Sequence, residues 1–276
     1  MSLQIIATPI GNPGDITLRA IEALRAADVI VGEERSEVSK LLKRLDITDK
    51  RVELLNEHTK DDEVNELLML CRKQKVALVS DCGTPGFCDP GSRLVRVCRR
   101  DGVAVQGLPG ASSLMTLLSL NGVDLREFVF RGFLPAERGE RALALNELRR
   151  ERRAVVLMDT PYRLGRLMSE LAEVFGERTA LLGLDLTQPT EKILEGPVSK
   201  LALDVAGMKA EFVLLLHPSE VEGAAIVARA DQPPRRDSRL EGGPSSRPDS
   251  RPSSRPGAPR VKTRKFTPGR RDGKKR

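Results

Sequence analysis

A 14-residue run after a predicted strand holds the densest group of residues that could do chemistry. This run, residues 78–91, reads Leu-Val-Ser-Asp-Cys-Gly-Thr-Pro-Gly-Phe-Cys-Asp-Pro-Gly. Its glycines and prolines let the backbone approach a small molecule closely and hold a fixed shape. In an open α/β sheet, ligands bind beyond the carboxyl ends of the strands. A turn chosen only for its geometry is the simpler alternative, but two aspartates and an Asp-Pro-Gly step favour a ligand-binding loop.

Two more loops of the same kind follow predicted strands. Residues 8–15, Thr-Pro-Ile-Gly-Asn-Pro-Gly-Asp, follow an apolar strand and precede a predicted helix at 16–27. Residues 108–113, Leu-Pro-Gly-Ala-Ser-Ser, open a helix at 114–120, where hydroxyls and free amides suit a carboxylate or a ribose. Neither loop is a dinucleotide-binding Gly-x-Gly-x-x-Gly or a P-loop. Three such loops on successive strand ends predict a ligand cleft.

These motifs, with Gly-Phe-Leu-Pro at 132–135, resemble those of the ribosomal RNA small-subunit methyltransferase I family. That family belongs to the tetrapyrrole methylase superfamily, and the likeness covers about residues 3–217. The resemblance implies an α/β fold of two α/β domains with a cleft between them that binds S-adenosylmethionine. It also implies 2′-O-ribose methylation of a cytidine in the decoding region of 16S ribosomal RNA.

The resemblance places the cofactor on the three loops and on the second domain. S-adenosylmethionine carries a positive charge at sulfur, so backbone carbonyls suit its surroundings better than Lys or Arg. The expected cofactor-binding residues are Pro9, Gly11, Asn12, Ser80, Asp81, Gly83, Thr84, Pro85, Ala111, Ser112, Ser113, Leu184 and Asp185.

The substrate side departs from the family pattern, whereas the cofactor loops are nearly intact. Residues 32–36 read Gly-Glu-Glu-Arg-Ser where the family has Ala-Glu-Asp-Thr-Arg. Segments 159–164 and 183–188 lose a His, an Arg and a Lys of the pattern. We expect Glu33, Glu34 and Arg35, at a strand end, to orient the ribose or help to remove its proton, with Glu34 and Arg35 as the predicted catalytic residues. A solvated salt bridge at the start of a helix is the alternative.

A cluster of arginines surrounds the Gly-Phe-Leu-Pro motif. Of these, Arg131, Arg138 and Arg141 are the predicted substrate-binding residues for RNA phosphates. A solvated charged face is the alternative. The expected partner is 16S ribosomal RNA or the small ribosomal subunit, and the resemblance further implies a homodimer.

The C-terminal segment 229–276 differs in composition from the rest of the chain. It holds 16 of the 46 Lys and Arg but five of the 39 Asp and Glu, so residues 1–228 keep 30 basic and 34 acidic side chains. Repeated Ser-Arg-Pro steps bury too little apolar surface to offset the entropy cost of ordering. The sequence therefore predicts a disordered basic tail that adds salt-sensitive contacts to phosphates.

Composition also limits the compartment and the metal content. The N-terminus lacks a basic region followed by a long apolar stretch, and no apolar run approaches the roughly 20 residues of a membrane span. The four cysteines lack Cys-x-x-Cys spacing, and Cys71 and Cys98 are expected to fill core space. We expect a cytoplasmic protein with no membrane contact and no metal site.

Strands and helices alternate in the first half of the chain. Strands are predicted at 4–7, 29–32, 52–55, 76–80 and 103–107, with helices at 17–27, 37–45, 61–74 and 92–101. This rhythm predicts a mostly parallel sheet covered by helices. Beyond 122, strands are predicted at 128–134, 154–158, 180–185, 192–195 and 211–216, with helices at 142–150 and 164–175. The predicted domains are 1–123 and 124–228, the second with an antiparallel portion near 187–190.

Two other function classes remain open at this point. One is a methylase of the same fold that acts on a tetrapyrrole or another compact small molecule. The other is a non-catalytic RNA-binding or ribosome-assembly protein, which the substrate-side departures make conceivable and the intact cofactor loops argue against.

Overall fold

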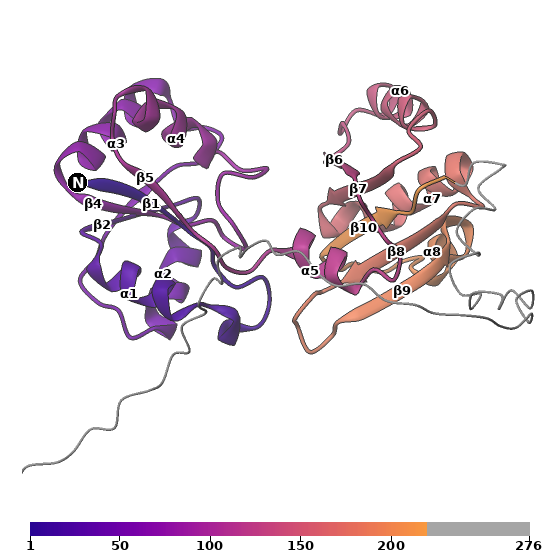
Figure 1. Cartoon of the computed structure of the whole chain (residues 1–276), viewed down its shortest axis with the longest axis horizontal. Helices are drawn as coiled ribbons and strands as arrows, with labels where there is room; N and C mark the ends of the chain where they lie inside the picture. The colour runs from indigo at the N-terminus through magenta and orange to yellow at the C-terminus, as the bar shows by residue number, and fades with distance from the viewer. Residues whose placement is uncertain (220–276) are drawn as a thin grey trace, which may run out of the picture. The chain divides into compact units, whose positions relative to one another are not determined.

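The structure is a computed structural model, and it describes residues 1–219. These residues belong to one compact unit, Met1–Ala224. They form two five-stranded sheets, the first built from strands up to Leu108 and the second from strands beyond Phe128 (Figure 1). The predicted basic tail at 229–276 lies outside the described residues. No helix in the described part of the chain is long and apolar enough to cross a membrane.

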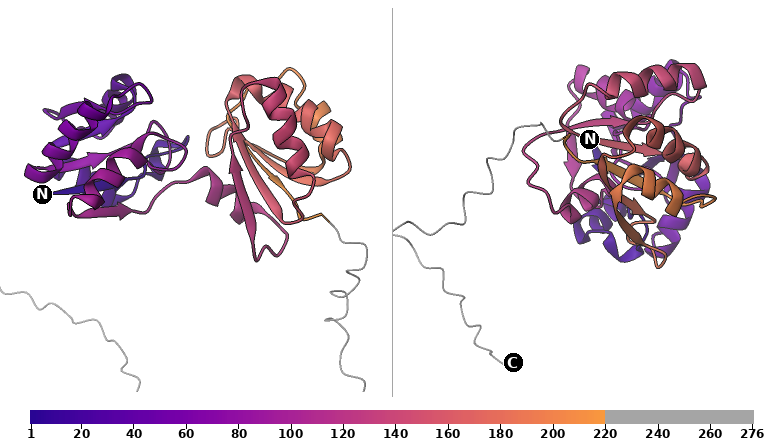
Figure 2. Two further views of the ribbon diagram at one scale, coloured as in Figure 1. Left: turned by 90° about the horizontal axis from the view of Figure 1, so that it is seen from above. Right: turned by 90° about the vertical axis from the view of Figure 1, so that its right-hand side faces the viewer.

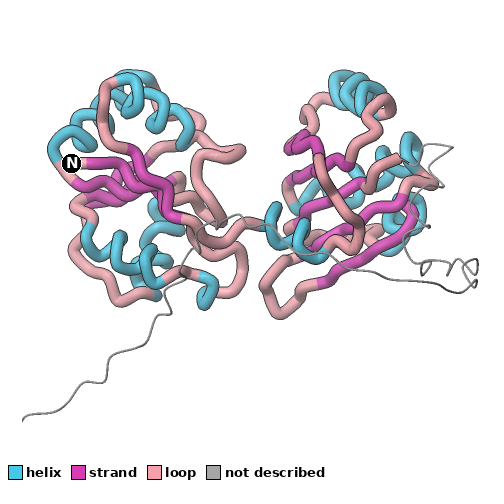
Figure 3. Tube along the Cα trace, viewed as in Figure 1, coloured by secondary structure: helices cyan, strands magenta, loops and turns pink. Residues whose placement is uncertain are grey.

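The first sheet is parallel throughout, as predicted, with strand order β3-β2-β4-β1-β5. Its strands are β1 (Ser2–Ile6), β2 (Val29–Gly32), β3 (Arg51–Leu54), β4 (Lys75–Leu78) and β5 (Val105–Leu108). Helices connect consecutive strands: α1 (Leu18–Ala26), α2 (Arg35–Arg44), α3 (Asp61–Lys73) and α4 (Gly91–Arg100). In a parallel sheet all carboxyl strand ends lie at one edge, so the three loops singled out in the sequence leave from the same edge (Figure 3).

Alternation along the strands builds a core on each face of this sheet. Val29 and Val31 pack with the apolar sides of α3 and α4, whereas Ile30 packs with α1 and α2. Figures 1 and 2 show the sheet between these two helical layers. The prediction that Cys71 and Cys98 fill core space is confirmed, since both are buried in the first of these clusters.

The second sheet is mixed, with strand order β6-β7-β10-β8-β9. Its strands are β6 (Phe128–Gly132), β7 (Ala154–Asp159), β8 (Thr179–Leu184), β9 (Lys192–Pro197) and β10 (Phe212–Leu216). Only β6 and β7 pair in parallel, and β8 and β9 form the predicted antiparallel hairpin. One face packs against α6 (Arg138–Leu148), α7 (Leu164–Phe175) and α8 (Val198–Asp204), and the other against α5 (Ser113–Leu120).

Two details of this sheet differ from the sequence-based expectation. Helix α6 begins four residues before the predicted start, because the Glu137 side chain caps it by accepting a hydrogen bond from the Glu140 N–H at 2.7 Å. Helix α8 was not predicted, since seven residues give little periodic signal. Val198, Leu201 and Val205 nevertheless repeat at helical spacing and are all buried.

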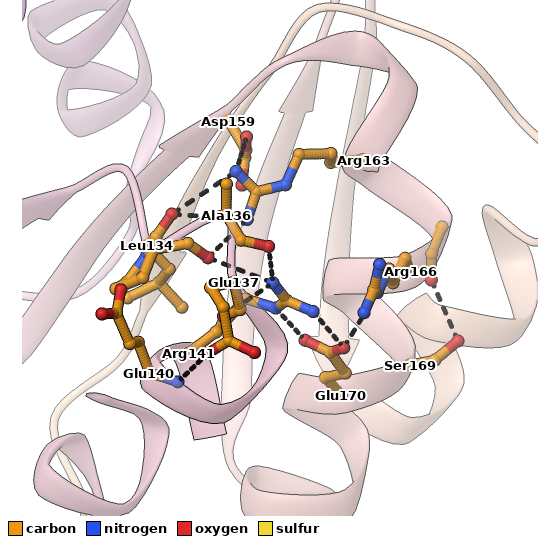
Figure 4. A network of polar contacts seen from close by, with 12 residues as sticks. Leu134, Ala136, Glu137, Glu140, Arg141, Asp159, Arg163, Arg166, Ser169 and Glu170 are labelled. Carbon is orange, nitrogen blue, oxygen red and sulfur yellow. Dashed lines mark hydrogen bonds and ion pairs between the residues drawn. The ribbon is translucent and has the colours of Figure 1, made fainter. Parts of the chain in front are cut away.

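Two arginines fasten the loop that follows β6, the Gly-Phe-Leu-Pro loop, to the helices behind it (Figure 4). Arg141 of α6 donates two hydrogen bonds to the carboxylate of Glu170 on α7, at 2.5 and 2.8 Å. Its remaining amino group donates to the carbonyls of Pro135 and Ala136 at 3.1 and 2.7 Å. Arg163, paired with Asp159 at 3.2 Å, donates to the Pro135 carbonyl at 3.0 Å. Two cations thus hold consecutive carbonyls of one loop.

The predicted role of Arg141 in RNA binding is wrong. Its surface is 1% exposed, so no phosphate can reach the guanidinium. Its donors are taken up by Glu170 and by the loop carbonyls, and this partnership lowers the pKa of Glu170 to about 2. Arg141 is therefore a structural residue that fixes the Gly-Phe-Leu-Pro loop.

We expect Arg141→Met to lower the free energy of unfolding by about 3 kcal/mol. Removing one partner of a buried ion pair leaves the other charge uncompensated, at a cost of roughly 3–5 kcal/mol, and the partial exposure of Glu170 favours the lower end. Urea unfolding monitored by circular dichroism measures the change. The matched control is Arg138→Met, an exposed residue of the same helix, which should shift stability by less than about 0.5 kcal/mol. Equal stabilities for the two variants would contradict the clamp.

Candidate functional site

Two backbone hydrogen bonds join the loops that follow β1 and β4. The Thr8 N–H donates to the Gly83 carbonyl at 2.8 Å, and the Gly83 N–H donates back to the Thr8 carbonyl at 3.2 Å. The buried Thr8 hydroxyl also donates to the Ser80 carbonyl at 3.2 Å. Gly83 has a φ of 78°, a left-handed conformation that glycine adopts without strain. This Thr8–Gly83 bridge holds the two motif-bearing loops in one rigid unit.

A cavity of about 450 Å³ lies on one side of this bridge; we call it the large cavity. Its volume falls in the range of roughly 300–1,000 Å³ that small-molecule sites occupy. Loops of the first sheet, the start of α5 and residues of the second sheet all line it. Its lining is largely apolar, and among the described residues there Glu211 is charged while none is Lys or Arg.

A second cavity, of about 250 Å³, lies against helix α2; we call it the α2 cavity. One face of the helix lines it, because Glu37, Lys40, Leu41, Arg44 and Leu45 recur at helical spacing. Its other walls come from the loops after β1 and β4, including Ile16, Val79 and Asp81.

The two cavities are neighbours. Ile10 and Cys82 line both of them, so these two side chains form a common wall. Ile10 belongs to the loop after β1, and Cys82 directly precedes Gly83 of the bridge. The two cavities therefore adjoin at Ile10 and Cys82, and their occupants would be neighbours.

Two neighbouring carboxylates, Glu33 and Asp81, have perturbed pKa values, and Asp81 lines the α2 cavity next to Cys82. The Asp81 backbone lies close enough to Glu33 to act on its pKa, and the Glu34 backbone acts in the same way on Asp81. Burial raises the pKa of Glu33 to about 7, with further contributions from the negative charges of Asp81 and Asp89. Burial also raises the pKa of Asp81. A carboxylate that titrates near neutral pH can accept a proton and then release it.

Glu34 and Arg35, the residues predicted to be catalytic, lie at the start of α2. Both are exposed, and Glu34 is the N-cap residue of the helix. The Glu34 carboxylate accepts a weak hydrogen bond from the Ser36 hydroxyl at 3.4 Å. The sequence-based prediction grouped Glu33 with Glu34 and Arg35 but gave the catalytic role to the latter two. The signal was available, because Glu33 continues the alternation of Val29 and Val31 toward the interior.

The structure distributes the predicted cofactor residues over both cavities. Gly83, Thr84, Ser112 and Ser113 line the large cavity, whereas Pro9, Gly11, Ser80 and Asp81 line the α2 cavity. Ala111 accepts a hydrogen bond from the Thr84 hydroxyl at 3.1 Å, and Pro85 follows Thr84 in the same loop.

The loop after β1 touches the turn after β8. The Asn12 N–H donates to the Thr187 hydroxyl at 2.9 Å. A Cβ at Gly11 would come within 2.6 Å of the Leu186 carbonyl, so only glycine fits this approach. Leu184 points into the core beneath α7, and its neighbour Asp185 binds the Glu211 N–H at 3.0 Å. These contacts link the two sheets at the large cavity.

The second sheet supplies cavity residues that sequence reasoning missed: Met158, Leu186, Glu211, Phe212 and Val213. Strand β10 runs antiparallel to β8, and Phe212 pairs with Leu184, so the start of β10 meets the end of β8. Burial and the nearby Asp185 raise the pKa of Glu211.

The remaining predicted substrate residues differ in exposure. Arg138 is exposed at the first position of α6, and Arg131 is half-buried near the end of β6.

Comparison with known proteins identifies the fold. The model of the family of Tetrapyrrole (Corrin/Porphyrin) Methylases matches residues 2–202. The Thermus thermophilus uroporphyrin-III-C-methyltransferase structure has a TM-score of 0.55 at 21% identity and covers 78% of this chain and 94% of that one. A diphthine synthase structure has a TM-score of 0.61 at 16% identity over 79% of this chain and 90% of that one.

Two relatives are similar over most of their length. Ribosomal RNA small subunit methyltransferase I of Neisseria meningitidis serogroup B is 38% identical over 226 residues, 80% of this chain and 77% of that protein. The protein of the same name from Leptospira biflexa is 37% identical over 216 residues, 78% of this chain and 90% of that protein.

The large cavity fits the cofactor of such methylases, S-adenosylmethionine. Its apolar walls, seryl hydroxyls and single acidic side chain suit a molecule with a flat ring, a ribose and a positively charged sulfur. The two-sheet α/β fold and the cofactor expected from the sequence are thus confirmed, and the chain belongs to the tetrapyrrole (corrin/porphyrin) methylase family.

Proposed function

We propose that this methylase transfers the methyl group of S-adenosylmethionine to the ribose 2′-oxygen of a cytidine in the decoding region of 16S ribosomal RNA. The observation that carries the proposal is the pair of adjoining cavities, one of them lined by Asp81, with the carboxylate of Glu33 close to Asp81 and its pKa raised to about 7. The names of the relatives, which specify the RNA of the small ribosomal subunit, support this substrate. We further propose the small subunit as the partner, a homodimer as the assembly and the cytoplasm as the location.

Positioning supplies most of the catalysis in this proposal. S-adenosylmethionine provides an electrophilic methyl group on a sulfonium, and the acceptor oxygen must approach it in line. Holding both partners aligned can contribute roughly 7–11 kcal/mol to lowering the barrier. The Thr8–Gly83 bridge serves this purpose, because it fixes the loops on either side of the common wall.

The cofactor is assigned to the large cavity. Gly83, Thr84, Ser112 and Ser113 would hold its polar groups, and the apolar side chains of the second sheet would pack on its ring. The Glu211 carboxylate would balance its positive charge.

Proton removal is assigned to Glu33, with Asp81 beside it. A ribose hydroxyl is a weak nucleophile until a base accepts its proton. With a pKa of about 7, Glu33 is substantially ionised at neutral pH and still basic enough to accept a proton. Glu34 and Arg35 remain candidates for orienting the ribose from the surface.

The substrate assignment predicts that the full chain labels unmodified small ribosomal subunits with tritium from S-adenosylmethionine. A 2′-O-methyl group blocks alkaline cleavage of the adjacent phosphodiester, so the labelled nucleotide should survive alkali as part of a dinucleotide that contains cytidine. Large subunits serve as the control and should stay unlabelled. Label in a base, or labelling of a tetrapyrrole instead of RNA, would overturn the proposed function.

We expect Ser113→Phe to weaken binding of S-adenosylmethionine at least about 10-fold, or roughly 1.4 kcal/mol. Ser113 lines the large cavity at the first turn of α5, and a phenyl ring there takes up the space of the ligand. Isothermal titration calorimetry measures the dissociation constant. The matched control is Ser119→Phe on the exposed side of the same helix, which should bind within twofold of wild type. Equal affinities would place the cofactor elsewhere.

The role of Glu33 predicts a specific dependence on pH. Only the ionised carboxylate can accept a proton, so the single-turnover rate should rise with pH up to about 7 and level off above it. Glu33→Gln should lower that rate by about 10²-fold or more and remove this rise.

Two further variants locate the reaction centre. Glu34→Gln makes the same chemical change one residue away and should keep the wild-type pH profile, while Arg35→Ala tests the neighbouring cation. A large loss with Glu34→Gln or Arg35→Ala, together with a normal Glu33→Gln, would return the catalytic role to the helix start.

A further inference from the structure

The α2 cavity is left without an occupant once the cofactor is assigned to the large cavity. It shares Ile10 and Cys82 with the large cavity, so a group bound in it lies next to the cofactor. Methyl transfer requires the acceptor to be within about 3–3.5 Å of the methyl donor. The neighbouring position therefore suits part of the methyl acceptor.

The interior of this cavity suits a flat apolar ring. Ile16, Val38, Leu41, Leu45 and Val79 contribute side chains to its walls. Its volume of about 250 Å³ lies below the roughly 300–1,000 Å³ of sites for complete drug-sized ligands. A single nucleotide suits this space better than a tetrapyrrole or a stretch of folded RNA.

Two cations stand on the same face of α2. Lys40 and Arg44 are one helical turn apart, and both are exposed at the cavity. Lys40 is paired with Glu37 at 2.6 Å, an exposed ion pair that contributes little and can exchange partners. Within the described residues, Arg44 has no carboxylate partner. Exposed cations beside an apolar cavity suit the phosphates that flank a base.

Resting on the proposed function, we infer that the α2 cavity receives the target pyrimidine nucleotide, flipped out of the RNA, with Lys40 and Arg44 binding its flanking phosphates. Enzymes that do chemistry on a base take that base out of the stack into a pocket, and we extend this arrangement to a target whose ribose reacts. The base packs on Val38, Leu41 and Val79, which leaves the ribose toward the common wall. Asp81 lines this cavity next to Cys82 of that wall, and Glu33 lies close to Asp81, so their carboxylates are on the ribose side.

The test compares the double variant Lys40→Gln/Arg44→Gln with the single variant Lys43→Gln. Lys43 is exposed on the same helix but faces a different surface hollow, so it controls for the loss of charge. Single-turnover methylation of small subunits should show at least a 10-fold higher half-saturating subunit concentration for the double variant, and less than a twofold change for Lys43→Gln. Lost phosphate contacts should also flatten the salt dependence, reducing the slope by about 1 to 2.

Two controls keep this inference separate from the proposed function. Calorimetric affinity for S-adenosylmethionine should be unchanged in the double variant, because the cofactor occupies the other cavity. Cytidine 5′-monophosphate added alone to the wild-type protein should give saturation-transfer NMR signals, and these should weaken in the double variant and in Leu41→Trp, which fills the cavity.

The possible results distinguish a failure of the nucleotide site from a failure of the proposed function. Normal subunit saturation in the double variant, or nucleotide signals that persist with Leu41→Trp, would overturn the nucleotide site even if ribosomal RNA is methylated. Nucleotide binding that responds to these variants while small subunits stay unlabelled would instead count against the proposed function and leave the site standing.

Discussion

The site depends on the Thr8–Gly83 bridge. Its two hydrogen bonds, 2.8 and 3.2 Å long, tie the loop after β1 to the loop after β4 at the carboxyl edge of a parallel sheet. Each loop leaves its strand at a fixed point, so the bridge turns two flexible connections into one wall. Ile10 and Cys82 on this wall face both cavities. Separating the loops would therefore disturb both cavities together.

Charge is distributed over the two cavities according to the chemistry proposed for each. The large cavity has an acidic residue, Glu211, which suits a cationic cofactor. The α2 cavity has two acidic residues, Glu37 and Asp81, and two exposed cations, Lys40 and Arg44, of which the cations suit phosphates. Close to Asp81, burial and the repulsion of nearby carboxylates raise the pKa of Glu33 to about 7. The same few loops thus offer an acidic residue for the sulfonium, cations for the phosphates and a carboxylate that can accept a proton.

The parallel sheet, the mixed sheet and the three cavity loops could be predicted from the sequence. The patterns that predict these elements are local in the sequence. Buried strands such as β2 and β4 are short apolar runs, and the loops are rich in glycine and proline. The antiparallel hairpin of β8 and β9 could be predicted because no helix separates the two strands. Helix α8 could not, because seven residues fall below the length at which periodicity decides.

The role of a charged residue depends on what its side chain packs against in the folded protein, and the sequence alone gives little information about that packing. Arg141 and Arg138 lie three residues apart on α6 in the same basic segment, yet one is buried against Glu170 and the other is exposed. Glu33 and Glu34 are adjacent and identical in type, yet Glu33 lies close to Asp81 while Glu34 is exposed at the N-cap position of α2. In each pair the difference is one step along a strand or one turn of a helix. Such a step moves a side chain from solvent into a buried environment. For Glu33 this burial is the main reason that its pKa is raised to about 7.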